Sequence, residues 1–231
     1  MTGNTSYRQR VWTLAACCGT MNIVPQWSTI TILIKHKPMK ILLILGHPKP
    51  NSFNGAVAEQ SMAILEKLGH EVIFHDLYQE HFDPVLPAEE ENLPDEELPV
   101  ILQEHLRHFK EAEGVIFVHP NWWGGPPAIL RGWIDRVIRS NSCYQFTKDG
   151  VVSHVGEKIV QIFSTSNTPR DVEMNVYGDP IEIFWKVVVF GLLGTKSFER
   201  RNFESVILST PEERSHWLTE VAAVLKRRFP F

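Results

Sequence analysis

The sequence has little of what several classes of protein require. Only three of its 231 residues are cysteine, and they form no CxxC pair. A disulfide framework is therefore not expected, whereas a reducing compartment, the cytoplasm, is. No apolar run approaches the ~20 residues that a membrane-spanning helix needs. A net charge of −4 leaves no basic excess for binding nucleic acid. With 43% hydrophobic residues, the chain is expected to form one globular domain.

The first 38 residues show no period of either a strand or a helix. The letters LAAC, ending at Cys17, are similar to a lipoprotein cleavage box, but the apolar stretch before them is shorter than that of a signal peptide. At Met39 the letters MK lead directly into a continuous apolar run. We therefore expect a domain over residues 39–231, and residues 1–38 as an N-terminal extension that is poorly ordered or reflects a start site placed too early.

From Met39 onward the pattern alternates between strand and helix. Apolar runs bounded by turn residues predict buried strands. They occur at 40–46, 71–78, 114–120, 156–164 and 196–204. Segments with helical spacing lie between and after them, at 54–68, 100–112, 126–140, 181–193 and 211–228. Thr210 with Glu213 three residues later forms a capping box for the last helix. Parallel strands with helical crossovers predict an α/β sheet covered on both faces, in either a Rossmann-like or a flavodoxin-like order.

Two polar features are expected to face solvent. The acidic run around residues 89–97 is typical of a solvated loop that leads into a helix. His105 and His108 lie one turn apart on the following helix, but no HExxH motif accompanies them. We therefore expect a solvated histidine pair and no metal site.

Ligands of such sheets bind outside the carboxyl ends of the strands, so the loops there carry the candidate chemistry. The first loop, HPKPNSFN, lacks the glycines of the dinucleotide and P-loop motifs. It places Ser52 and Asn54 at a helix entrance. There they serve either as caps alone or, with His47, as part of an anion site fit for a phosphate.

The loop after the third strand reads HPNWWGGPP. Trp122 and Trp123 offer flat surface beside the backbone donors of Gly124 and Gly125, which suits an extended planar ligand. The alternatives are core residues or a dimer contact. A polar loop, STSNTPRD, follows the fourth strand at the same sheet edge. A phosphate site, an aromatic surface and a polar loop together favour a flavin.

The same residues carry a resemblance to a known family. GHPKPNSFN, PNWWGGPPAILRGWIDRV and the GD of VYGDP are similar to motifs of the NAD(P)H:quinone oxidoreductases, including bacterial modulator-of-drug-activity and potassium-efflux ancillary relatives. The resemblance covers about residues 39–228. It implies a three-layer flavodoxin-like fold with a five-stranded parallel sheet in the order 2-1-3-4-5.

The resemblance also implies a function and a site. The function is two-electron transfer of hydride from NAD(P)H through a flavin, FAD or alternatively FMN, to a quinone-like acceptor, in a cytoplasmic homodimer. The implied cofactor contacts are His47, Ser52, Phe53, Asn54, Pro120, Asn121, Trp122, Trp123, Gly124, Ser164, Thr165, Ser166 and Asn167. The implied catalytic residues are Tyr177 and Trp123, and the implied substrate contacts are Tyr144, Phe146 and Tyr177.

The sequence departs from the family pattern in two places. Ser166 and Asn167 replace a glycine pair, and Tyr177 replaces a histidine. A tyrosine donates a hydrogen bond but is no cation at neutral pH. Two other functions stay open: a flavin-holding ancillary subunit of a membrane transporter, and a one-electron flavodoxin-type carrier.

Overall fold

The computed structural model describes residues 37–231. Nearly all of the predicted extension lies outside these residues. The main sheet has five parallel strands in the order β2-β1-β3-β6-β7. They are β1 (Lys40–Leu45), β2 (Glu71–Asp76), β3 (Gly114–Pro120), β6 (Lys158–Thr165) and β7 (Thr195–Phe203). When the five strands of this sheet are numbered in chain order, their order across the sheet is the predicted 2-1-3-4-5. The flavodoxin-like fold is therefore confirmed.

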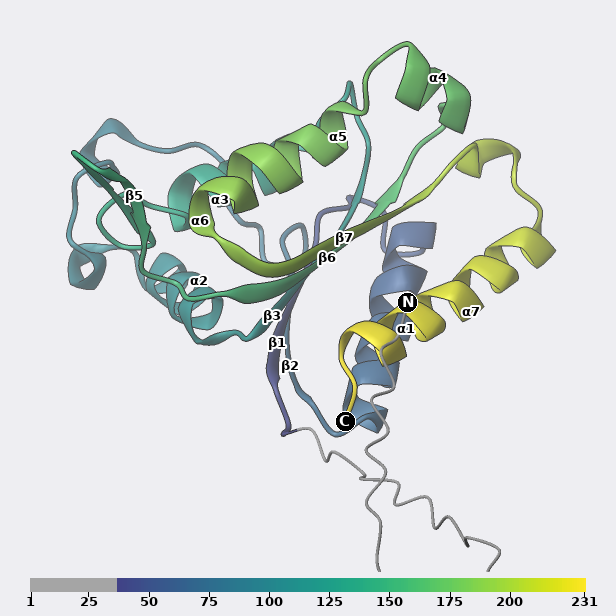
Figure 1. Cartoon of the computed structure of the whole chain (residues 1–231), viewed down its shortest axis with the longest axis horizontal. Coiled ribbons are helices and arrows are strands. Elements are labelled where there is room, and N and C mark those ends of the chain that lie inside the picture. Colours follow the sequence, from purple (N-terminus) through teal and green to yellow (C-terminus); the bar gives the residue numbers. More distant parts are fainter. Residues whose placement is uncertain (1–36) are drawn as a thin grey trace, which may run out of the picture. The chain divides into compact units, whose positions relative to one another are not determined.

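Helices cover both faces of the sheet (Figure 1). One face carries α1 (Phe53–Lys67) and α7 (Pro211–Arg228). The other carries α2 (Val100–Glu111), α3 (Ala128–Val137), α5 (Pro180–Glu182), the π-helix η3 (Ile183–Val189) and α6 (Phe190–Leu193). Among the described helices, none combines the length and apolar character that crossing a bilayer would require.

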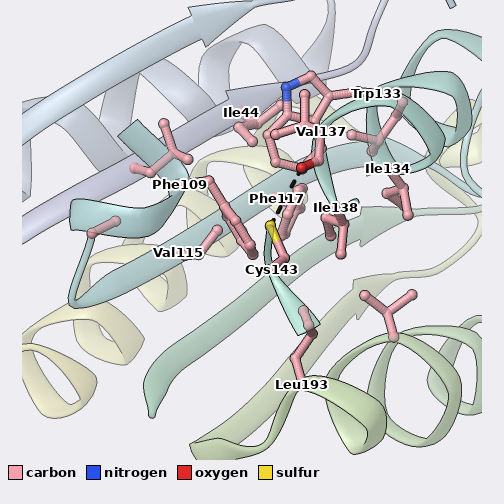
Figure 2. Packing of buried hydrophobic residues seen from close by; sticks show 14 of the residues in the cluster. Ile44, Phe109, Val115, Phe117, Trp133, Ile134, Val137, Ile138, Cys143 and Leu193 are labelled. Atoms are coloured by element: carbon pink, nitrogen blue, oxygen red, sulfur yellow. Dashed lines mark hydrogen bonds between the residues drawn. The ribbon is translucent and has the colours of Figure 1, made fainter. Parts of the chain in front are cut away.

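Each face of the sheet has its own hydrophobic core. The core under α2 and α3 is built on Phe109, Phe117 and Trp133, which are fully buried (Figure 2). Cys143 lies inside it, and its Sγ donates to the Val137 carbonyl at 3.4 Å. Burying each such large side chain contributes about 1.5–3 kcal/mol, so these aromatic residues fix how α2 and α3 pack on the sheet.

Some elements differ from the sequence prediction. The capping box of α7 is present as predicted. The predicted helix 181–193 is instead three consecutive pieces with a π-helical centre. A two-stranded hairpin and one short helix were not predicted: β4 (Tyr144–Thr147) with β5 (Gly150–Ser153), and α4 (Arg170–Asn175). Single-turn helices complete the described elements: η1 (Ala88–Glu90), η2 (Asp95–Glu97) and η4 (Val206–Leu208).

The expectation of a wholly solvated acidic run is wrong for one residue. Glu90 is buried, and its carboxylate accepts two hydrogen bonds from Arg136, at 2.9 Å from Nε and 2.5 Å from Nη2. Arg139 donates to the Glu90 carbonyl at 3.0 Å. The run therefore attaches the long loop before α2 to α3.

The two histidines of α2 are also buried, so the expectation of a solvated pair is wrong. His105 is 1% exposed and His108 is 9% exposed. The Trp133 indole N–H donates to His105 Nδ1 at 2.8 Å. His105 Nε2 then carries the ring hydrogen, and it lies 3.3 Å from Glu80 Oε2. The partners of His105 come from other elements, and a helical pattern alone does not reveal them.

His75, at the end of β2, completes this cluster. Arg107 donates to His108 Nε2 at 2.8 Å, His108 Nδ1 lies 2.9 Å from His75 Nε2, and His75 Nδ1 lies 2.7 Å from Glu80 Oε1. Ligand atoms of His75, Glu80 and His105 lie within 4.8 Å of one another, a spacing that suits a metal ion. In this arrangement, however, both ring nitrogens that face Glu80 carry hydrogens, and a metal ligand needs a lone pair there. We interpret the cluster as a hydrogen-bonded polar network.

Candidate cofactor site

Three loops predicted to form one site do converge at the carboxyl edge of the sheet. Asn54 lies at the start of α1 and Thr165 at the end of β6. The Asn54 Nδ2 donates to Thr165 Oγ1 over 3.0 Å. The rings of His47, after β1, and Trp122, after β3, lie 6.3 Å apart. The structure therefore brings these three loops together. Burial lowers the pKa of His47, which makes its neutral form more prevalent at neutral pH.

The first loop enters α1 through a cap. Ser52 Oγ accepts the Gly55 N–H at 3.0 Å, so its side chain caps the helix as the simpler of the two sequence interpretations predicted. The Phe53 ring packs against Phe203 and Trp217, with centroids 5.4 and 5.6 Å away. Asn54 is 3% exposed, and its Oδ1 is a buried acceptor without a partner among the described residues. A buried unsatisfied acceptor is unusual and indicates a missing ligand group or water.

The second loop is a tight turn. The N–H of Trp122 donates to the Gly125 carbonyl at 3.0 Å, and the Gly125 N–H donates back at 3.1 Å. The two central residues, Trp123 and Gly124, have φ of 56° and 75°. Trp123 is fully solvent-exposed, and Trp122 is 44% exposed. Neither tryptophan is a core residue, which excludes one of the alternatives.

The Trp123 backbone combines strain with an available donor. A positive φ at a bulky residue costs about 1–3 kcal/mol, and such strain is concentrated at functional sites. The Gly124 N–H is held by Asn121 Oδ1 at 3.0 Å. In the described part of the chain, the Trp123 N–H pairs with no acceptor. The turn therefore presents one unpaired backbone donor beside exposed indole surface.

Asn121 connects this turn to the rest of the site. Its amide Nδ2 donates to Glu173 Oε1 on α4 at 2.8 Å, and its backbone N–H donates to the Thr165 carbonyl. Glu173 is 2% exposed, and burial raises the pKa of its carboxyl group. Asn121 thus stabilises the turn, and both polar atoms of its side chain are hydrogen-bonded within the protein.

The chain between α4 and α5, residues 176–179, contains Tyr177 and leads to a contact with the tryptophan turn. Asp179 caps α5, and the following Pro180 lies so close to Gly124 that a Cβ there would be 3.1 Å from its ring. Arg200, on β7, holds this segment with bonds to Asp179 at 2.5 Å and to Glu182 at 3.1 Å. Tyr177 itself is 60% exposed. Arg200 was not predicted from the sequence, because a lone arginine in a strand belongs to no motif.

The third loop is mainly buried and internally bonded. Ser164 Oγ donates to Asn202 Oδ1 at 2.8 Å, and Ser166 Oγ donates to the Thr168 carbonyl at 3.1 Å. Asn167 Oδ1 accepts the Ile207 N–H at 3.1 Å. The side chains of these three predicted contacts are thus engaged within the protein, and Thr165 is the one that reaches the first loop.

The two predicted substrate aromatics lie on the β4–β5 hairpin. Tyr144 and Phe146 pack edge to face, with centroids 5.5 Å apart, and Phe146 is 65% exposed. Tyr144 lines a groove of about 360 Å³ together with Arg131 and Phe184. Within the described residues, no hydrogen bond or ring contact joins this pair to the tryptophan turn.

A second hollow adjoins the first loop and was not predicted. It has a volume of about 600 Å³ and lies between the N-termini of α1 and α7. Ser52 and Phe53 line one side, and Pro211 and Arg214 line the other. Arg214 is the basic residue of this hollow, and its Nη1 donates to the Ser209 carbonyl at 3.0 Å.

Comparison with known proteins agrees with the observed fold. Residues 39–226 match the model of a family described by its flavodoxin-like fold, and the chain belongs to this family. An uncharacterized NAD(P)H oxidoreductase of Haemophilus influenzae is 34% identical over 142 residues, which are 60% of this chain and 70% of that protein. NAD(P)H dehydrogenase (quinone) 1 of Rattus norvegicus is 33% identical over 126 residues, 46% of each chain, so the match spans less than half of that relative. The crystal structure of Smu.1420 from Streptococcus mutans UA159 has 32% identity and a TM-score of 0.73, covering 82% of this chain and 100% of that chain.

Proposed function

We propose that this protein is a flavin-dependent NAD(P)H oxidoreductase that reduces quinones or similar acceptors by two-electron transfer. The observation that carries the proposal is the strained turn at Trp123, whose N–H finds no acceptor among residues 37–231 and lies beside exposed indole surface where three loops meet. The names of the Haemophilus and rat relatives support the same chemistry.

The residues present fit a flavin. The turn at Trp122 and Trp123 offers a flat surface for a planar ring, and the Trp123 N–H offers a hydrogen bond to a ring edge. The buried, unpartnered Asn54 Oδ1 lies at the helix entrance where we place the phosphate side. The flavin would accept hydride from NAD(P)H and pass it to the acceptor, which is chemistry that the protein itself cannot supply.

The protein's own contribution is to orient the cofactor and the substrates. We assign Tyr177 to the open side of the turn, where its hydroxyl donates a hydrogen bond, and Tyr144 and Phe146 to the acceptor's aromatic surroundings. The remaining predicted contacts, at Ser164, Ser166 and Asn167, act through the backbone of their loop, because their side chains are bonded internally.

FAD is the favoured cofactor, with FMN as the alternative. The hollow between α1 and α7 continues from Ser52 and contains Arg214, whose guanidinium suits a diphosphate and whose apolar neighbours suit an adenine. An FMN would leave this hollow unused. Mass spectrometry of the cofactor released after reconstitution with equal amounts of both flavins tests this choice, and exclusive retention of FMN would contradict it.

We further propose a homodimer. Large apolar side chains between residues 176 and 188 are exposed, including Val176 at 70%, Ile183 at 50% and Val187 at 63%. Exposed apolar surface of this kind is typical of an interface. Sedimentation equilibrium measures the oligomeric state, and a monomer at micromolar concentration would contradict the homodimer.

We assign the protein to the cytoplasm and place residues 1–38 outside the catalytic domain.

Steady-state kinetics test the enzyme function. A reductase of this kind releases the oxidised nicotinamide before the acceptor binds, so double-reciprocal plots at several quinone concentrations should be parallel. Fast turnover without a membrane partner would argue against the transporter-subunit alternative, which the names of the relatives do not support. Accumulation of a stable one-electron-reduced flavin would instead favour the carrier.

A further inference from the structure

His119 is a buried histidine directly before the tryptophan turn. It is the penultimate residue of β3 and is 0% exposed. The Trp185 indole N–H donates to its Nε2 at 2.9 Å, so the ring hydrogen lies on Nδ1. Nδ1 then donates to the carbonyl of Pro120 at 2.9 Å. Trp185 thereby determines which ring nitrogen of His119 is the donor.

His119 influences the tryptophan turn through the peptide group that joins Pro120 to Asn121. The Pro120–Asn121 peptide is held at both ends: its carbonyl accepts from His119, and its N–H donates to the Thr165 carbonyl at 2.6 Å. A peptide fixed at both ends cannot rotate, and the strained turn begins at the next residue. The orientation of the unpaired Trp123 N–H therefore depends on His119.

Trp185 comes from the π-helix η3, Ile183–Val189. π-helical segments are rare and are frequently found at functional sites. Within this segment Trp185 and Val189 are buried, while Ile183, Val187 and Val188 are exposed. The chain just before the π-helix contacts the turn from outside, through Pro180 against Gly124. One continuous segment therefore restrains the turn from two directions.

Packing alone does not explain the Trp185–His119 bond, because the protein contains a matched pair. Trp133 is equally buried and donates to His105 Nδ1 at 2.8 Å. Both tryptophans contact Phe117, and Figure 2 shows Trp133 and Phe117 in the same cluster. The two histidines differ in the partner of their second ring nitrogen. His105 faces Glu80, which is distant in sequence from the turn, whereas His119 donates to the carbonyl of Pro120, directly before the turn.

We propose that His119 and Trp185 are positioning residues that fix the tryptophan turn as the surface on which the flavin ring is held. This inference rests on the proposed flavin function and adds two residues that do not touch the cofactor. Loss of the Trp185 donor frees the His119 ring to change tautomer or rotate. The Pro120 carbonyl then loses its partner, and the Trp123 N–H loses its fixed direction.

The test compares Trp185→Phe with Trp133→Phe. Each removes one buried indole donor from a histidine and keeps an aromatic ring, so both should lower thermal stability to a similar extent. Only Trp185→Phe should raise the flavin dissociation constant, by about fivefold for one lost hydrogen bond, and shift the flavin midpoint potential. Trp185→His keeps a ring N–H and should recover flavin affinity relative to Trp185→Phe despite its smaller ring.

Amide hydrogen exchange of the flavin-free protein gives a separate readout. Exchange at Asn121 and Gly124 should accelerate in Trp185→Phe and stay at the wild-type rate in Trp133→Phe. Equal flavin affinity, potential and exchange in the two phenylalanine variants would overturn the positioning role. Failure of the wild type to take up flavin would overturn the proposed function, and the exchange comparison would still decide whether Trp185 holds the turn.

Discussion

Asn121 and Glu173 join the tryptophan turn to helix α4 through a hydrogen bond of 2.8 Å. The other side-chain atom of Asn121 accepts the Gly124 N–H at 3.0 Å, so one amide holds the turn from both sides. Burial raises the pKa of the Glu173 carboxyl group, because its charged form has lost water, and the positive charge of Arg200 and the hydrogen bond from Asn121 only partly offset this effect. The pair explains how a turn with two positive φ angles is held in place.

Asn121→Ala should therefore weaken flavin binding strongly. It removes two hydrogen bonds and leaves a buried carboxyl group without its donor, which costs about 1–3 kcal/mol in the free energy of unfolding. The flavin dissociation constant should rise at least about tenfold, because the Trp123 N–H is no longer held in place. Fluorescence titration with flavin and urea unfolding measure the two effects. Asn92→Ala, in an exposed loop, is the control and should change neither.

Trp123→Asn should separate stability from function. The Trp123 side chain is fully exposed and contributes no burial, while asparagine tolerates a positive φ better than tryptophan does. The flavin-free variant should be as stable as the wild type or up to about 1 kcal/mol more stable. Its flavin affinity and quinone reductase rate should fall. A variant that loses stability but keeps full flavin affinity would show that the indole serves packing instead.

The ion pair between Glu90 and Arg136 should dominate the attachment of the loop before α2. Both side chains are nearly fully buried. Glu90→Ala leaves an uncompensated buried guanidinium and should lower the free energy of unfolding by about 3–5 kcal/mol. Glu111→Ala removes a carboxylate that pairs at the surface with Lys40 and Arg107, and it should leave stability nearly unchanged. Equal urea midpoints for the two variants would contradict this account.

Stability should fall as the solution becomes acidic. Burial lowers the pKa of His119 from 6.5 to about 4, so the folded state holds this ring neutral where the unfolded state protonates it. The contribution is complete above pH 6.5 and decreases by about 2–3 kcal/mol between pH 6.5 and 4.5. Burial also lowers the pKa of His105 and of His108, which adds to the loss in the same range.

Unfolding free energies at pH 7.5 and pH 4.5 measure this loss. His119→Asn should be less stable than the wild type at pH 7.5 but should lose less stability between the two pH values. An equal loss in both proteins would show that His119 does not contribute to the acid sensitivity.

The sequence predicted the sheet because its strands are continuous apolar runs and its helices have apolar faces with recognisable ends, as at Thr210. It also predicted which loops meet, since parallel strands place their carboxyl ends at one edge. The hairpin around Tyr144 was missed, because most of its residues are exposed and show no alternation of burial.

The remaining differences depend on partners distant in sequence. His105 is buried because Trp133 and Glu80 satisfy its ring, and neither is visible from the spacing along α2. Arg200 and Trp185 act on the turn through tertiary contacts and carry no motif. The predicted roles of Ser164 and Ser166 were drawn from their location in the loop, whereas their side-chain bonds are fixed by Asn202 and Thr168.

Anaerobic reduction of the reconstituted protein decides whether this chain is a flavin-dependent NAD(P)H oxidoreductase. The purified protein is reconstituted with FAD and FMN, freed of unbound flavin, and titrated anaerobically with NADPH and NADH while the visible spectrum is recorded. We expect that flavin stays bound, and that its oxidised absorption band disappears with one equivalent of nicotinamide without a one-electron intermediate. A protein that retains neither flavin, or whose bound flavin is not reduced by either nicotinamide, would contradict it.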